Sequence, residues 1–167
     1  NAQQEELFSW TGRGIGNIRM IFREEVFVSR ALRKPVIRGC PVCLREDIEV
    51  DEVRPLTQMT MRGDWQLREV SLCVKHRHSL VPLWEQPRPD DRYDLSSRFA
   101  DILTDVLEGK LERPRVTPSP YDYWLDTRLK TGADDTRLAD QSLHATTSFC
   151  TLLGTELLRL KPRAELD

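Results

Sequence analysis

The stretch RGCPVCLRED, residues 38–47, places two of the chain's four cysteines two residues apart. The same spacing returns downstream, where Cys73-Val-Lys-His76 joins a thiol to an imidazole. Each pair puts two ligands on one short turn, and two such knuckles complete the tetrahedral shell that structural zinc prefers. The spacing therefore predicts a structural Cys3His zinc site formed by Cys40, Cys43, Cys73 and His76.

Other interpretations of these residues remain open at the level of sequence. A Cys-x-x-Cys pair also occurs in redox proteins, structural disulfides form in oxidising compartments, and isolated cysteines are often buried core thiols. A catalytic zinc ion would need an open coordination position. Structural zinc explains both knuckles at once, which the other interpretations do not. His78 could replace His76 as the fourth ligand, whereas Cys150 is expected to be a packed core thiol.

The composition around the knuckles is that of a globular protein. The chain has 167 residues, of which 39% are hydrophobic and 31% charged, and its formal net charge is -2. No apolar run approaches the ~20 residues that span a bilayer. The first residues lack the basic and apolar regions of a secretory signal. We therefore expect a cytoplasmic protein without a membrane segment.

Two proline-bearing stretches, residues 84–94 and 112–122, interrupt regular structure and divide the chain. Residues 1–83 are predicted to form an N-terminal segment that contains the zinc module, and residues 84–167 a helical domain. The predicted fold class is α+β, with a small zinc-knuckle module and short strands followed by a mainly helical C-terminal part.

Three helices are predicted in that C-terminal part. The first covers residues 95–108 after Asp94 as its N-cap, and the second follows Ser119 and ends at Gly132. The third covers residues 140–160. Their apolar stripes predict that the first and third helices pack together. The side chains expected to be buried between them are Phe99, Val106, Cys150 and Leu157.

Basic side chains gather on both sides of the first knuckle and beside the second. Between residues 11 and 45 they outnumber the acidic ones several-fold. Such a stretch is either a solvated surface or a footprint for phosphates or an acidic partner. The candidate nucleic-acid or partner-binding residues are Arg30, Arg33, Lys34, Arg38, Lys75 and Arg77.

The knuckles belong to a longer pattern. The phrase Arg38-Gly-Cys40-Pro41-x-Cys43-Leu44-x-Glu46-Asp47 is followed by Trp65 and then by Cys73-x-x-His76-x-x-Ser79-Leu80. This pattern resembles the zinc module of the TniQ family, to which the TnsD transposition proteins are related. The opening Glu5-Glu6-Leu7-Phe8-Ser9-Trp10 is similar to the phrase with which the family begins a helical segment.

The resemblance implies a bacterial, non-catalytic adaptor that selects where a transposon inserts. Such an adaptor binds target DNA or a guide-RNA complex and passes the signal to an AAA+ transposition regulator and a transposase. Family members combine zinc knuckles with helix-turn-helix elements, and the resemblance allows a homodimer. The zinc ion would hold the scaffold and take no part in chemistry.

Two other functions remain as alternatives. A zinc-stabilised DNA-binding regulator unrelated to transposition would bind specific DNA tightly without an ATPase partner. A metal-dependent hydrolase is disfavoured, because the sequence has no His-Glu-x-x-His phrase, Gly-rich phosphate loop or nucleophile elbow. The sequence does not determine the target site, the oligomeric state, or the choice between direct and guide-RNA-mediated targeting. The stretch between Trp10 and Cys40 is shorter than the family pattern, so a segment could be missing there. Asp167 follows soon after the third predicted helix, which likewise leaves a missing segment after it open.

Overall fold

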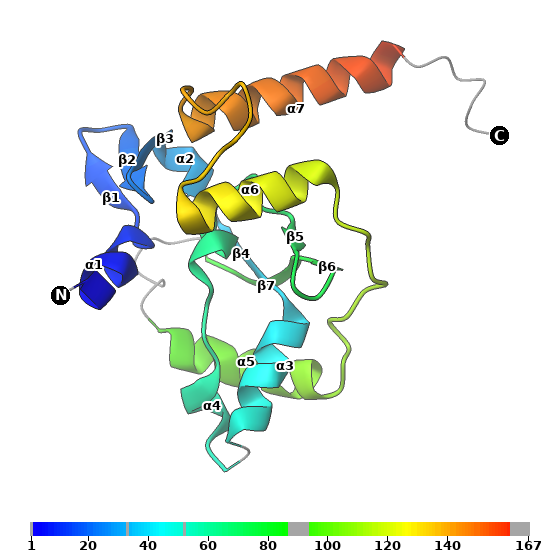
Figure 1. The fold of residues 1–167 in the computed structure, drawn as a ribbon. Helices are drawn as coiled ribbons and strands as arrows, with labels where there is room; N and C mark the ends of the chain where they lie inside the picture. Colours follow the sequence, from blue (N-terminus) through cyan, green and yellow to red (C-terminus); the bar gives the residue numbers. More distant parts are fainter. Residues whose placement is uncertain (1, 33, 52, 87–93, 161–167) are drawn as a thin grey trace.

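The computed structural model describes residues 2–32, 34–51, 53–86 and 94–160 (Figure 1). The helices are α1 (Ala2–Ser9), α2 (Ser29–Leu32), α3 (Pro41–Val50), α4 (Pro55–Gln58), the 3-10 helix η1 (Gly63–Gln66), α5 (Leu95–Leu107), α6 (Pro120–Thr131) and α7 (Leu143–Leu160). The strands are β1 (Arg13–Ile15), β2 (Arg19–Phe22), β3 (Glu25–Val28), β4 (Val36–Gly39), β5 (Leu72–Cys73), β6 (His78–Ser79) and β7 (Val81–Glu85). Short strands in the N-terminal part and longer helices in the C-terminal part confirm the predicted α+β class.

The first sheet is antiparallel, with the strand order β1-β2-β3. Its β2–β3 turn holds Arg23 and Glu24 at φ angles of 50° and 62°, a left-handed conformation that is uncommon outside glycine. The Arg23 side chain is fixed in this turn by two carbonyl groups of α6. Its Nε donates to the Leu129 carbonyl at 2.7 Å and its Nη2 to the Lys130 carbonyl at 2.8 Å. A cation at these last carbonyls also complements the negative end of the helix, so the turn ties the sheet to α6.

Two further strand pairs frame the knuckles. Strands β4 and β7 form one antiparallel pair, and β5 and β6 form a hairpin. Helix α5 lies against α3 and α4, and its Phe99 packs edge to face on Trp84 of β7, with 5.8 Å between the ring centroids. One hydrophobic core joins residues of both halves of the chain, and the domain division between residues 83 and 84 stays a prediction.

The predicted ends of α5 and α6 are confirmed. Asp94 accepts a hydrogen bond from the Ser97 N–H at the start of α5. Ser119 and Asp122 form a capping box at the start of α6, and Gly132 ends that helix at a φ angle of 71°. These boundaries depend on local backbone chemistry, which the sequence displays directly.

Helix α7 departs from the predicted packing. Its first turns bury Leu143 and Thr147 beside β3, and the rest extends away from the body of the molecule (Figure 1). Phe99 of α5 is buried, but Cys150 is only half-buried and Leu157 is 56% exposed. The prediction that α5 and α7 bury their stripes against each other is therefore wrong. No helix in the described part of the chain is long and apolar enough to cross a membrane.

The physical reason lies at the start of α7. The Leu143 N–H donates to the Glu25 carboxylate of β3 at 2.9 Å, and Arg128 of α6 donates to the Gln141 carbonyl just before the helix. These bonds fix where α7 begins and in which direction it leaves. At about 1.5 Å per residue its 18 residues reach about 27 Å, so its far end passes beyond the strand that it packs on.

Candidate metal centre

The first knuckle is formed by the start of α3. Cys40 is the N-cap residue, Pro41 takes the first helical position, and Cys43 lies in the first turn. Proline suits this position because its missing N–H would have no helical partner there. Both thiols are buried at the N-terminus of the helix, where the helix dipole favours thiolates.

Gly39 sets how closely the knuckle approaches the core. A Cβ atom added at Gly39 would lie 2.8 Å from the Trp65 ring and 2.7 Å from the Leu83 side chain, closer than real Cβ contacts allow. Trp65 of η1 is itself buried. The glycine before Cys40 and the tryptophan before the second knuckle therefore belong to one packing arrangement, which explains why both occur in the same sequence pattern.

The second knuckle is the β5–β6 hairpin. Cys73 ends β5, and His76 lies in the turn that leads to β6. Arg77 adopts a φ angle of 53° in the same turn. This tight reversal brings the His76 imidazole back toward the Cys73 thiol, with 3.7 Å between Nδ1 and Sγ.

The four predicted ligands meet in one cluster. The three Sγ atoms and His76 Nδ1 all lie within 4.8 Å of one another. His76 Nδ1 is 3.6 Å from Cys40 Sγ and 3.2 Å from Cys43 Sγ, and Cys43 Sγ is 3.7 Å from Cys73 Sγ. Tetrahedral zinc bonded at about 2.3 Å to sulfur and about 2.0 Å to nitrogen would hold neighbouring ligand atoms about 3.5–3.8 Å apart. The cluster can hold a metal ion, and its dimensions fit zinc.

The thiols of the cluster influence one another's ionisation. Hydrogen bonds from Cys40 and Cys43 lower the pKa of Cys73 to about 2. Contacts with Cys40 and Cys73, together with burial, raise the pKa of Cys43. The hydrogen bond with Cys43 lowers the pKa of Cys40, but Cys73 and burial together outweigh it, and the net pKa is raised to about 11. Three close thiols thus favour a single thiolate on their own, and a divalent cation would supply the charge needed to ionise all three.

Glu46 supports the imidazole from the next turn of α3. Its carboxylate accepts from His76 Nε2 at 2.9 Å and from Lys75 Nζ at 2.5 Å. Such a carboxylate fixes the tautomer of a ligating histidine and leaves its other nitrogen for the metal. The hydrogen bond from Lys75, and then that from His76, hold the pKa of Glu46 below its usual value. The sequence pattern contained Glu46, but its role depends on a contact that only the fold creates.

Asp47 links α3 to Arg62, the residue that precedes η1. Its two carboxylate oxygens accept from the two Nη atoms of Arg62, at 2.7 and 2.6 Å. Arg62 immediately precedes η1, which carries Trp65. The Glu-Asp pair of the sequence pattern therefore connects α3 both to the second knuckle and to the tryptophan beside Gly39.

His78 lies outside the cluster. It is fully buried, its Nδ1 donates to the Ser79 carbonyl at 2.6 Å, and its Nε2 accepts from the Arg113 N–H at 2.8 Å. Val116 reinforces this contact, because its N–H donates to the Arg77 carbonyl at 2.7 Å. His78 thus ties the connection between α5 and α6 to the knuckle, and both of its nitrogens have partners.

The remaining thiol and the basic candidates lie elsewhere. Cys150 is on α7 and is not part of the cluster. Lys75 is paired with Glu46, Arg77 is exposed, and Arg33 lies outside the described residues. Lys34 and Arg38 line one pocket.

Arg68 joins these basic residues, although the sequence did not single it out. The charges of Arg38 and Arg68 both act on Lys34, and Arg68 lines a groove beside α7 together with Arg30. Within the described part of the chain, none of these four cations forms an ion pair, although the charge of Glu69 acts on Lys34 and Arg38. They make up a basic surface, which we define as Arg30, Lys34, Arg38 and Arg68.

Comparison with known proteins agrees with the sequence pattern. Residues 2–80 match the model of the TniQ family. This part of the chain is thus similar to the TniQ domain. The matched range contains α1, the first sheet, both knuckles and η1, so the resemblance seen around Cys40 and Cys73 extends through the N-terminal helix. Searches of curated proteins and of solved structures gave no significant match.

Proposed function

We propose that this chain is a non-catalytic adaptor in DNA transposition, which selects the target site and recruits the transposition machinery. The observation that carries the proposal is the TniQ match over residues 2–80. TniQ domains are associated with transposition target selection. The proposed partners are target DNA or a guide-RNA complex on one side, and an AAA+ regulator with its transposase on the other.

In this proposal the metal is zinc and its role is structural. Three thiolates and one imidazole are a donor set suited to zinc. All four tetrahedral positions are supplied by the protein, so none remains for a substrate or a reactive water molecule. The ion would join α3 to the β5–β6 hairpin and keep the surfaces around them in place.

The basic surface supports contact with an anionic partner. Arg30 and Arg68 are exposed, Lys34 and Arg38 are half-buried, and no carboxylate among the described residues neutralises them in an ion pair. Phosphates and acidic side chains are the natural counterions of such a surface. Lys75 contributes less, because Glu46 already pairs with it.

A plasmid assay would test the adaptor role. A transposase and an AAA+ regulator of a TniQ-dependent transposon would be expressed with or without the chain, and insertions would be mapped by sequencing. We expect insertions to concentrate at a preferred target only when the chain is present. Cys40→Ser should abolish that preference, whereas Cys150→Ser, which removes the thiol outside the cluster, should preserve it.

Identical insertion maps with and without the chain would refute the adaptor role. Tight binding of one DNA sequence by the isolated chain, without any effect on insertion, would instead support a zinc-stabilised DNA-binding regulator. The two functions are therefore separated by the same pair of measurements.

A further inference from the structure

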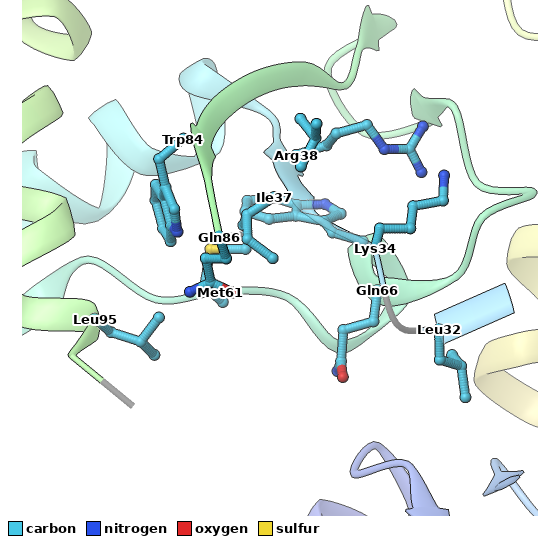
Figure 2. A pocket seen from close by; sticks show the side chains of 11 residues that line it. Leu32, Lys34, Ile37, Arg38, Met61, Gln66, Trp84, Gln86 and Leu95 are labelled. Carbon is cyan, nitrogen blue, oxygen red and sulfur yellow. The ribbon is translucent and has the colours of Figure 1, made fainter. Parts of the chain in front are cut away.

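A pocket of about 290 Å³ opens between β4, β7 and η1 (Figure 2). Its walls are mainly apolar and include Ile37, Met61, Trp84 and Leu95. Lys34 and Arg38 reach the same side of the pocket, and their charged ends point in a common direction in Figure 2. The pocket thus combines an apolar interior with a rim that is basic on one side.

Neither cation of this rim forms an ion pair with a described carboxylate, although the charge of Glu69 acts on both. Arg38 Nη2 donates to the carbonyls of Leu67 and Val70, at 3.2 and 3.0 Å, which fixes the guanidinium in place. Burial, and then the charges of Arg38 and Arg68, lower the pKa of Lys34, and the charge of Glu69 offsets only part of this shift. No carboxylate within the described residues forms an ion pair with Lys34 or Arg38. An incoming anion would relieve this repulsion.

The pocket wall also contains a donor that lacks an acceptor. Trp84 Nε1 is buried and has no hydrogen-bond partner in the described part of the chain. A buried donor without an acceptor costs about 1–3 kcal/mol. Because this atom is fully buried, a bound molecule could accept from it only after the Trp84 ring shifts.

We propose that this pocket binds a short acidic peptide segment of a partner protein. One apolar side chain of the peptide would enter between Ile37, Met61 and Leu95, and the flanking carboxylates would face Lys34 and Arg38. The volume of about 290 Å³ lies at the lower end of small-ligand pockets, which span about 300–1,000 Å³, and it accommodates one side chain of a peptide. Because Trp65 and Trp84 also line the pocket, a nucleobase stacked on an indole is the competing occupant that the experiment must exclude. The inference deepens the adaptor proposal, on which it rests for the existence of a protein partner.

A peptide array probed with the full chain would test the pocket. Its members would be peptides of about eight residues, with central Leu, Ile, Phe or Trp flanked by Asp and Glu. Matched members would carry Ala at the central positions, or Lys in the flanks. We expect binding to require both the apolar centre and the acidic flanks.

Two charge-reversal variants would locate the binding. Lys34→Glu should weaken the best peptide by about tenfold or more, because it replaces an attractive charge at the rim by a repulsive one. Arg13→Glu reverses an exposed cation on β1, away from the pocket lining, and should leave affinity unchanged. Thermal unfolding of both variants would show that the fold is retained.

Three results would overturn the proposal. They are equal binding of the Ala-centred peptides, equal affinity of Lys34→Glu and the unmodified chain, or no binding up to about 1 mM peptide. Displacement of peptide by oligothymidylate, with higher affinity for the DNA, would assign the pocket to nucleic acid instead. Because these measurements use the chain alone, their failure leaves the insertion-site result intact, and a failed insertion assay with intact peptide binding would refute only the adaptor role.

Discussion

Removing the metal should unfold the part of the molecule that surrounds both knuckles. The ligand cluster is the point where the start of α3 meets the β5–β6 hairpin. Trp65 packs over Gly39 beside it, and α5 reaches the same region through the contact between Phe99 and Trp84. Loss of the ion should therefore destabilise both α3 and the β5–β6 hairpin rather than a single loop.

The expected size of this effect is comparable with the whole stability of a domain. A structural zinc ion contributes about 10–16 kcal/mol in small zinc-binding modules at pH 7, whereas a native domain is stable by only about 5–15 kcal/mol. The three thiols left behind could not all stay ionised, since burial and neighbouring thiols raise the pKa values of Cys40 and Cys43. The chelated protein should therefore lose most of the free energy that holds residues 38–83 in place.

Hydrogen exchange with and without a chelator would measure this. We expect the amides of α3, β5 and β6 to approach the exchange rates of an unfolded chain, and those of α5 to follow, because α5 packs on α3. Helix α6 should lose less protection, since Arg23 ties it to the β2–β3 turn.

Two cysteine variants supply the matched comparison. Cys40→Ser should reproduce the chelated pattern, because it leaves only three of the four ligands. Cys150→Ser should behave as the unmodified protein, because this thiol lies outside the cluster. Unchanged protection across residues 38–83 after complete metal removal would refute the structural role of the ion.

Three further predictions concern polar contacts. Glu46→Gln should weaken zinc binding by about tenfold or more in chelator competition, because it weakens the carboxylate support of the imidazole, whereas Glu49→Gln on the exposed side of α3 should have no effect. Arg128→Met should lower the free energy of unfolding in urea by about 3–5 kcal/mol, because it leaves the buried Asp134 and the partly exposed Glu25 without their cation. By contrast, Lys130→Met removes an exposed pair worth at most about 1 kcal/mol. Burial opposes ionisation of Asp134, but hydrogen bonds, including one from Arg128, lower its pKa from 3.8 to about 2. Its stabilisation is therefore complete above about pH 4 and lost as the pH falls toward 2, and Asp134→Asn should flatten the acid-unfolding curve in that window.

The features that sequence could predict are those set by neighbouring residues. Two ligands separated by two residues share one turn, so the spacing around Cys40 and Cys73 already implied a common site. The helix boundaries at Asp94, Ser119 and Gly132 were predictable for the same reason, because caps involve backbone groups within a few positions.

The features that sequence could not predict depend on partners far along the chain. Spacing favours His76 but also permits His78 as a ligand, and the fold separates them by giving His78 the Arg113 N–H as a partner. Arg68 joins Lys34 and Arg38 only because η1 leads the chain back beside β4. No local pattern marks either contact.

Helices α5 and α7 show that an apolar stripe does not by itself determine where a helix packs. Both have one, yet Phe99 of α5 is buried and Leu157 of α7 is exposed. The stripe indicates that burial of this face would be favourable, but it does not indicate which surface covers it. In this chain that choice is made by charged groups, since Glu25 binds the first amide of α7 and also pairs with Arg128 of α6. Polar contacts between distant segments thus fix where α7 begins and in which direction it leaves, and α7 is left with a face that the described residues do not cover.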